Sequence, residues 1–394
     1  MKILFFDWKS YGKEHVVKAL EEFGHEVDRV HFDHEKDNDD DSYVKKAEEL
    51  LSYHIYDIVL SLNYFSAIAK ACHENGVIYI SWLYDSPLLQ VWATSAYYPE
   101  CYIFSFDQKQ CDGLKKEGIN KVYYMPLAVE TDWLDEITPT DNQREYFQGD
   151  VAFVGNLYDK KTPLQNEIIK ANPEILCGYS DAIIEAQIQL LGVNFLEDVL
   201  EPEDIKNIIN KMMIKKPEQG LIAPMTMVYA NYYLGTEVTL KERRRMIQKV
   251  SENYNLNVYS NSDISSFTKA NNKGGVDYYK EMPLVFRHSK INLNLTLRSI
   301  QTGIPLRCWD ILGSGGFLLS NYQADMSKHF EAGVDYDYFV NEEDMLKKIE
   351  YYLENEDERI RIAQNGYQKV KKYHSYKIRL KEMFKIVEEE ERRR

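Results

Sequence analysis

The first 130 residues alternate short apolar runs with segments in which apolar residues recur at helical spacing. Residues 2–7 read KILFFD and predict a buried strand, and residues 13–23 place apolar side chains on one helical face before Gly24. The same alternation continues to residue 126. Strands separated by helices of this length predict βαβ units and a parallel sheet. The first strand is not followed by Gly-x-Gly-x-x-Gly, so the usual dinucleotide-binding fingerprint is absent.

A second series of strand and helix signals begins with DVAFVG at residues 150–155. The polar, turn-rich residues before it predict a linker, and the segment 164–250 is largely helical by its apolar spacing. We therefore expect an N-terminal domain, a linker, a C-terminal domain that contains this helical insertion, and a final helix that packs back toward the N-terminal domain: residues 1–130, 131–149, 150–373 and 374–394. The expected fold class is α/β, with two Rossmann-like domains that face each other across a cleft. Ligands of such sheets bind beyond the carboxyl ends of the strands.

Composition and charge limit which partners and which cellular compartment the sequence predicts. The chain has 394 residues with 48 Lys and Arg against 63 Asp and Glu, a net charge of −15, which argues against nucleic acid as a partner. Five cysteines without a CxxC spacing indicate a reducing, cytoplasmic compartment. The N-terminus does not read as a signal peptide, and no apolar window approaches about 18 residues, so we expect no membrane span.

The segment of residues 292–321 carries the highest density of chemically informative residues. A predicted strand runs into a loop with Arg298, Thr302 and Gly303, and Pro305 falls near the first position of a short helix. This order predicts a helix N-terminus at the carboxyl edge of a sheet, where the free N–H groups suit an anion.

Two arginines, Arg298 and Arg307, lie close to that helix N-terminus in sequence. Guanidinium groups match phosphate oxygens in a bidentate fashion, so this pair predicts a diphosphate site within an otherwise acidic protein. The alternative for Arg307 is an ion pair with Asp310, three residues further along the same helix.

The stretch GIPLRCWDILGSGGFLLSN, residues 303–321, resembles the C-terminal signature of the CgeB-type (spore-maturation) glycosyltransferases, which have the two-domain GT-B fold. Residues 57–87, which end in WLYDSP, and residues 150–161 and 335–379 resemble further parts of these enzymes. The resemblance implies a hexosyltransferase whose co-substrate is a nucleotide sugar, with UDP favoured, and which needs no other cofactor. It also implies that the C-terminal domain binds this donor. The N-terminal domain would then bind an acceptor, which is a glycan, a small molecule, or a cell-surface or spore-associated protein.

In many retaining GT-B enzymes, two Glu residues eight positions apart flank the donor. Here Asp310 stands at the second position, where it can accept hydrogen bonds from the ribose hydroxyls, and Thr302 stands at the first position without a charge. The resemblance therefore favours retention of the anomeric configuration but leaves the role of the first Glu unfilled. The residues expected to bind the nucleotide sugar are Gly12, Gly155, Asn156, Lys160, Thr302, Gly303, Ile304, Pro305 and Asp310. For Lys160, an exposed loop lysine is the alternative.

Glycosyl transfer builds negative charge on a leaving diphosphate, so preorganised donors and cations are the main catalytic requirement. We expect Arg298 and Arg307 to supply them. Asp85, which follows a predicted strand, is the third catalytic candidate, as an acceptor-orienting group or a general base; an Asx-type turn before Pro87 is the alternative. The acceptor side is expected to include Trp8, Asn63, Tyr64 and Trp82, with core packing as the alternative for Trp82.

No Asp-x-Asp sits at the end of a predicted strand, so we expect no metal site and metal-independent transfer. The acidic run at residues 33–41 is open to two interpretations, a metal-binding loop or a solvated loop. Two other functions remain as alternatives: a non-catalytic nucleotide-sugar-binding protein and a nucleotide-sugar epimerase of GT-B architecture. The helical stretch 164–250 is expected to shape the acceptor side or to form a homodimer contact.

Overall fold

The computed structural model describes residues 1–31, 41–53, 55–212 and 220–393, and it divides into two units. Unit 1 consists of Met1–Ala128, Lys216–Pro224 and His374–Arg394, and unit 2 consists of Val129–Lys215 and Met225–Tyr373. Most of the acidic run at residues 33–41 lies outside the described residues.

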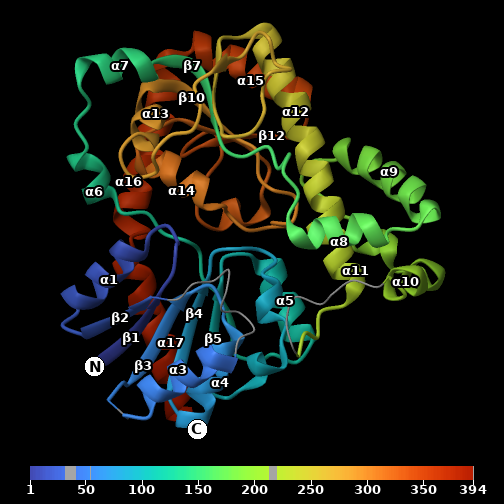
Figure 1. Ribbon diagram of the computed structural model, residues 1–394. Coiled ribbons are helices and arrows are strands. Elements are labelled where there is room, and N and C mark those ends of the chain that lie inside the picture. Colours follow the sequence, from blue (N-terminus) through green and yellow to red (C-terminus); the bar gives the residue numbers. More distant parts are fainter. Residues whose placement is uncertain (32–40, 54, 213–219, 394) are drawn as a thin grey trace. The chain divides into compact units, whose positions relative to one another are not determined.

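Unit 1 is built on a parallel sheet of six strands in the order β2-β1-β3-β4-β5-β6 (Figure 1). The strands are β1 (Lys2–Asp7), β2 (Glu26–His31), β3 (Ile58–Leu62), β4 (Ile78–Leu83), β5 (Cys101–Ser105) and β6 (Val122–Tyr124). Every residue of β3 and β5 is buried, as is usual for central parallel strands that helices cover on both faces. The strand order changes direction between β1 and β3, so the crevice beyond their carboxyl ends is the topological switch point of unit 1.

The helices of unit 1 come from the N-terminal segment and from the end of the chain. They are α1 (Lys13–Glu22), α3 (Asp41–Leu51), α4 (Ser66–Asn75), α5 (Gln108–Lys116) and α17 (Tyr376–Arg393). Helix α17 packs against α1, where the rings of His15 and Tyr376 lie 5.4 Å apart between centroids and Lys377 forms an ion pair with Glu22. The last helix is therefore part of unit 1, although it is distant in sequence.

Unit 2 also contains six parallel strands, in the order β12-β11-β10-β7-β8-β9. Their bounds are β7 (Gly149–Val154), β8 (Leu256–Tyr259), β9 (Asn271–Asn272), β10 (Ser289–Asn294), β11 (Leu318–Asn321) and β12 (Asp337–Phe339). The chain first builds β7, β8 and β9 outward in one direction and then β10, β11 and β12 in the other. This is the doubly wound order, and its switch point lies between the adjacent strands β7 and β10.

Residues 131–149, which we predicted as a linker, hold two helices of unit 2: α6 (Thr131–Glu136) and α7 (Asp141–Phe147). Helix α7 begins at a capping box, in which Thr140 and Gln143 exchange side-chain-to-backbone hydrogen bonds. Arg287 donates to two carbonyl oxygens at the end of α6, both at 2.9 Å. These contacts make the segment part of the folded unit.

The remaining helices of unit 2 are α8 (Pro163–Ala171), α9 (Glu174–Ile188), α10 (Glu203–Asn210), α11 (Met225–Val228), α12 (Gly235–Asn253), α13 (Met282–His288), α14 (Leu306–Gly313), α15 (Glu342–Glu354) and α16 (Glu356–Tyr373). A π-helical segment, Tyr229–Leu234, runs into α12. The predicted α/β class, with a parallel sheet in each half and a helical stretch in the second, is confirmed. In the part of the chain that the structure describes, none of the helices combines the length and apolar character needed to cross a membrane.

Candidate nucleotide-sugar site

The carboxyl ends of β7 and β10 lie side by side in unit 2, and the two loops that follow them form the candidate site. One loop begins with Gly155 and Asn156, and the other runs from Leu295 to Pro305 and leads into α14. Most residues predicted to bind the nucleotide sugar belong to these loops or to α14. The structure therefore brings them to one edge of one sheet.

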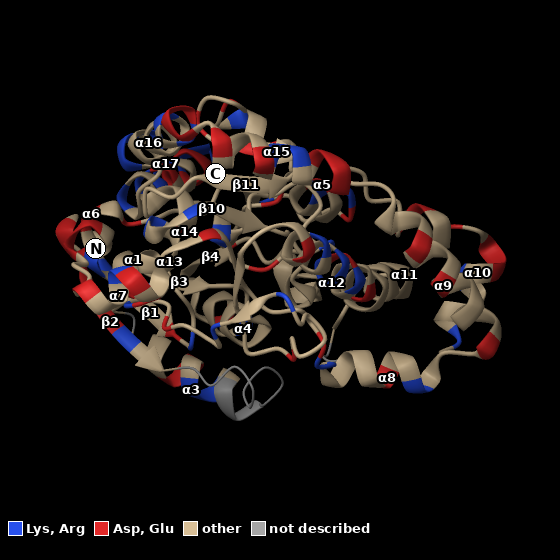
Figure 2. Cartoon of the chain, turned by 90° about the horizontal axis from the view of Figure 1, so that it is seen from above, with Lys and Arg blue, Asp and Glu red and all other residues tan. Residues whose placement is uncertain are grey.

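A buried cation that sequence reasoning missed links the two loops. Arg243, in α12, donates through Nη1 to the carbonyl oxygen of Asn156 and through Nη2 to the carbonyl oxygen of Leu295. Arg243 is 8% exposed. Burial lowers the pKa of its guanidinium, and the nearby positive charge of Arg307 lowers it further. The only available sequence signal was a run of three arginines at residues 243–245, on a helix whose basic character is visible in Figure 2.

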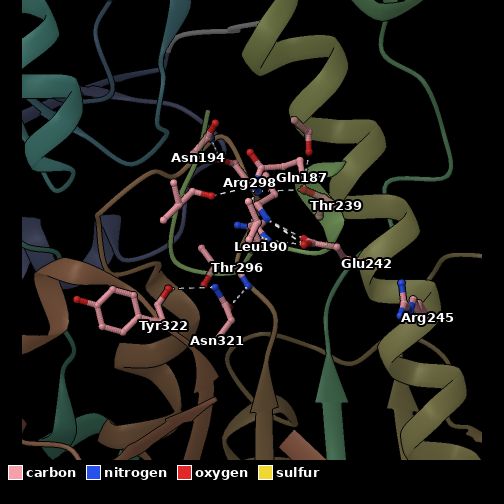
Figure 3. A network of polar contacts seen from close by, with 12 residues as sticks. Gln187, Leu190, Asn194, Thr239, Glu242, Arg245, Thr296, Arg298, Asn321 and Tyr322 are labelled. Atoms are coloured by element: carbon pink, nitrogen blue, oxygen red, sulfur yellow. Dashed lines mark hydrogen bonds and ion pairs between the residues drawn. The ribbon is translucent and has the colours of Figure 1, made fainter. Parts of the chain in front are cut away.

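In the structure, Arg298 forms a buried ion pair with Glu242 (Figure 3). Its Nε lies 3.0 and 2.9 Å from the two carboxylate oxygens of Glu242, and its Nη2 lies 2.8 Å from the carbonyl oxygen of Leu190. Its backbone N–H donates to Oγ1 of Thr239 at 2.9 Å, and its carbonyl oxygen accepts from Nδ2 of Asn194 at 2.8 Å. We predicted that Arg298 stabilises the leaving diphosphate, but Glu242 neutralises its charge. Arg298 instead ties the loop after β10 to α12 and to the helical stretch.

A pocket lies beside this network, beyond the carboxyl ends of β10 and β11. The backbone N–H of Thr296 donates to Oδ1 of Asn321 at 2.7 Å, which joins the loops after these two strands. The ring of Tyr322 packs so closely on Gly192 that a Cβ there would lie 2.9 Å from it. The pocket is lined by Gly192, Val193, Asn194, Thr296, Leu297, Arg298, Ile300, Gln301, Asn321, Tyr322 and Gln323. The helical stretch therefore contributes one wall of a pocket in unit 2.

Arg307 and Asp310 form the ion pair that the sequence offered as an alternative. Nη1 of Arg307 lies 3.3 Å from Oδ2 of Asp310, and Tyr278 donates its hydroxyl to Oδ1 at 2.8 Å. Burial raises the pKa of Asp310 to about 6, while Arg307 and Tyr278 act in the opposite direction. A carboxylate offers about four lone-pair positions, so Asp310 can still accept hydrogen bonds from a diol.

Thr302 and Pro305 bound the turn that leads into α14. The Thr302 hydroxyl donates to Oδ2 of Asp325 at 3.0 Å, so this side chain is engaged within the protein. Gly303 and Ile304, between them, are buried. Pro305 directly precedes Leu306, the first residue of the helix, with an extended backbone of φ −66° and ψ 153°, so it lies near the first helical position as predicted.

The loop after β7 exposes Asn156 and Lys160. Exposure is compatible with both interpretations of Lys160, so its contact with the donor stays a prediction. Oδ1 of Asn156 accepts from the backbone N–H of Tyr158 at 2.5 Å, and Tyr158 adopts a left-handed φ of 61°. Gly155 is half-buried, and a Cβ there would lie 3.7 Å from Nη1 of Arg243.

In unit 1, Asp85 is exposed just after β4, and Asn63, just after β3, orients it. Nδ2 of Asn63 donates to Oδ2 of Asp85 at 2.7 Å, and Oδ1 of Asn63 accepts from the backbone N–H of Tyr84 at 2.7 Å. Asn63 is 1% exposed and adopts a left-handed φ of 63°, which Asn tolerates better than most residues. Asp85 is therefore presented to solvent in a fixed orientation, and Asn63 supports it from within.

The aromatic residues predicted on the acceptor side are placed mainly for packing. Trp82 and Tyr64 are fully buried, and Tyr64 donates its hydroxyl to Oγ of Ser95 at 2.9 Å, so neither ring is available to stack on a ligand. Trp8 is half-buried and donates Nε1 to the carbonyl oxygen of Leu62 at 2.6 Å. The central strands of unit 1 are covered on both faces, which is why side chains at their ends are drawn into the core.

Gly12 permits a close approach, but the approaching group belongs to the protein. Its φ is 78°, and a Cβ at this position would clash with the hydroxyl oxygen of Tyr376 in α17. The prediction placed a nucleotide against this backbone. The structure instead uses the glycine to dock α17 against the first turn of α1.

Among residues 1–31, 41–53, 55–212 and 220–393, no group of three or more His, Cys, Asp or Glu side chains is arranged to hold a metal ion. The acidic run of the sequence falls mostly between the first two of these ranges. Metal independence of the reaction stays a prediction.

With this geometry in place, residues 241–385 match a family described as glycosyl transferase-like. The match begins in α12 and includes the loop after β10 and all of α14. The matched part includes five of the residues predicted to bind the donor: Thr302, Gly303, Ile304, Pro305 and Asp310. A search among curated proteins finds no significant match.

Solved structures with the same fold span nearly the whole chain. A glycosyltransferase from Rickettsia africae ESF-5 matches with a TM-score of 0.55 and 11% identity, over 98% of each chain. Anabaena Alr3699/HepE in complex with UDP-glucose matches with a TM-score of 0.54 and 11% identity, over 99% of this chain and 100% of that one. Sucrose-phosphate synthase from Thermosynechococcus elongatus matches with a TM-score of 0.55 and 8% identity, over 99% of this chain and 98% of that one. At these identities the likeness concerns the fold, and it confirms the predicted GT-B fold.

Proposed function

We propose that the protein is a glycosyltransferase that moves a sugar from a UDP-sugar to an acceptor hydroxyl. One observation carries the proposal. Arg307 and Asp310 lie side by side on α14, at the edge of the sheet where the switch point lies and within the segment that matches the glycosyl transferase-like family. A guanidinium suits the donor's diphosphate, and a carboxylate suits the ribose hydroxyls of the same molecule.

In the proposed reaction, the bond between the anomeric carbon and the diphosphate oxygen breaks, and its electron pair stays on the diphosphate. The acceptor oxygen forms the new bond to the anomeric carbon and loses its proton. With retention of configuration, which we propose, that proton ends on the departing diphosphate. With inversion, Asp85 would take it as a general base. Each charge-assisted hydrogen bond to the departing diphosphate contributes about 1.5–3 kcal/mol.

Narrower parts of the proposal have separate support. The Anabaena HepE structures in complex with UDP and with UDP-glucose, which share this fold, support UDP as the carrier. We propose that unit 2 binds the donor and that unit 1 binds the acceptor, with Asp85 orienting the acceptor hydroxyl. The resemblance to spore-maturation enzymes supports a protein, cell-surface or spore-associated acceptor. Five free cysteines support a cytoplasmic location. A homodimer stays a prediction.

A turnover assay tests the proposal. UDP-, GDP-, dTDP- and CMP-sugars are incubated with the protein, with and without candidate acceptors, and free nucleotide is measured. We expect acceptor-dependent release of UDP. A changed sugar on intact nucleotide would identify an epimerase instead, and binding without turnover under any condition would identify a non-catalytic binder.

Metal independence is tested in the same assay, because the proposed stabilisation of the diphosphate relies on arginines. We expect the rate to survive EDTA. Activity that EDTA abolishes and Mn²⁺ restores would contradict this part of the proposal.

A further inference from the structure

We infer that Arg243 is the main diphosphate-binding residue of unit 2 and stabilises the leaving nucleoside diphosphate through its guanidinium. The inference rests on the proposed function and deepens it, because it names the side chain that acts on the leaving group. It does not follow from the sequence pattern, which pointed to Arg298 for this role.

The position of Arg243 is the first argument. Its guanidinium bonds to the carbonyl oxygens of Asn156, just after β7, and of Leu295, just after β10. These are the two strands between which the order of the sheet changes direction, and ligands of such sheets bind beyond that point. The cation therefore sits where the fold itself predicts a ligand.

The unsatisfied hydrogen-bonding capacity of Arg243 is the second argument. A guanidinium has five N–H donors, and the contacts to the two carbonyl oxygens use two of them. Nε is buried without any hydrogen-bond partner, in a residue that is 8% exposed. Nε and the remaining N–H groups of the fork match the geometry with which arginine binds phosphate oxygens.

The charge of Arg243 is the third argument. In the described chain it has no carboxylate at ion-pair distance, whereas its helix neighbour Glu242 is engaged by Arg298. Tyr158 and, from a longer distance, Glu242 favour the charged form of Arg243, whereas burial and the positive charge of Arg307 oppose it. A buried cation without a counter-ion is costly for a folded protein, and a dianionic ligand offsets that cost.

The loop after β7 has a strained backbone conformation next to the guanidinium of Arg243. Tyr158 has a φ of 61°, an uncommon conformation for a bulky residue, and its ring centroid lies 5.1 Å from Cζ of Arg243. The ring of Phe153 lies 5.6 Å from the same atom. The two rings exclude water from the guanidinium, which strengthens its interaction with an anion.

Calorimetric titration of UDP, uridine and inorganic pyrophosphate tests the inference. We expect Arg243→Met to weaken UDP and pyrophosphate binding by about 10- to 100-fold and to leave uridine binding unchanged. Arg244→Met is the matched control, because Arg244 is the next residue of the helix and contacts Ser266 and Phe267. Its affinities should equal those of the wild type. An unchanged ratio of UDP to uridine affinity in Arg243→Met would overturn the inference.

If Arg243→Met does not fold, Arg243→Lys provides a second test of the inference. A lysine in this buried position has a lowered pKa, so its UDP affinity should fall as the pH rises from about 6 to 9, a dependence that a purely structural clamp would not produce. A pH-independent UDP affinity equal to that of the wild type would overturn the inference. Wild-type protein that binds neither UDP nor pyrophosphate would also overturn it, whereas the turnover assay with other nucleotide sugars would still decide the proposed function.

Discussion

Substitution of Arg298 distinguishes a structural role of this residue from a catalytic one. Arg298 and Glu242 are both 7% exposed, and the shortest N–O distance between them is 2.5 Å. Removing one partner of a buried pair costs about 3–5 kcal/mol, because the other charge is left uncompensated. Burial raises the pKa of Glu242 and Arg298 opposes that shift, so the carboxylate depends on the arginine to stay ionised. We expect Arg298→Met to lower the melting temperature of unit 2 by about 6–20 °C.

Differential scanning calorimetry on a double-mutant cycle measures this. Glu242→Leu combined with Arg298→Met should recover most of the loss, because an apolar pair can replace a buried ion pair at little cost. A residual loss of about 1 kcal/mol is expected, since the carbonyl oxygen of Leu190 loses its donor. Arg245→Met is the control on the same helix. Arg245 is exposed and pairs with Glu342, so its removal should cost less than about 1 kcal/mol.

The activity of the double variant decides the role of Arg298. If Arg298 only braces the loop after β10, the refolded double variant should transfer sugar at nearly the wild-type rate. A double variant that regains stability but stays 10- to 100-fold slower, on the order expected for a lost charge-assisted contact, would refute the reasoning.

Three more contacts give measurable outcomes. Asp310 has a pKa raised by burial from 3.8 to about 6, so the folded chain binds its proton more readily than the unfolded chain. The free energy of unfolding should therefore fall by roughly 3 kcal/mol as the pH rises from about 4 to 6, and Asp310→Asn should flatten this slope in urea titrations; an unchanged slope would contradict the assignment. Asn63→Gly keeps a left-handed backbone but removes the amide that orients Asp85, so steady-state kinetics should show kcat reduced about tenfold with donor affinity intact, and a change in donor affinity alone would contradict this. Gly12→Ala should destabilise unit 1 by about 1–3 kcal/mol in denaturant, because the new Cβ meets the Tyr376 hydroxyl; wild-type stability would show that α17 can move away freely.

The regular elements were predictable wherever apolar periodicity was strong. The strand at Lys2–Asp7 has the predicted bounds, because buried parallel strands read as continuous apolar runs. Helix α7 was missed, although Thr140 and Gln143 stand at the spacing of a capping box. Strand β12 has three residues, DYF, which is too short to show a period.

The candidate site was predictable in place but not in its division of roles. The position of Arg307 and Asp310 on one helix face follows from their spacing of three residues. The partner of Arg298 does not, because Glu242 lies 56 residues earlier and meets it only through tertiary packing. For the same reason the sequence could not separate Arg243, which turns inward, from Arg244 and Arg245 beside it. Tyr64 was likewise judged by its position at a strand end, whereas the structure buries it in the core; for Trp82, the structure confirms the core-packing alternative.

A crystal structure of the protein with bound UDP tests the central claim most directly. The account predicts the diphosphate beyond the carboxyl ends of β7 and β10, with its oxygens within hydrogen-bond distance of Arg243 and Arg307 and with the ribose hydroxyls at Asp310. A nucleotide bound elsewhere, for instance at the switch point of unit 1, would contradict it.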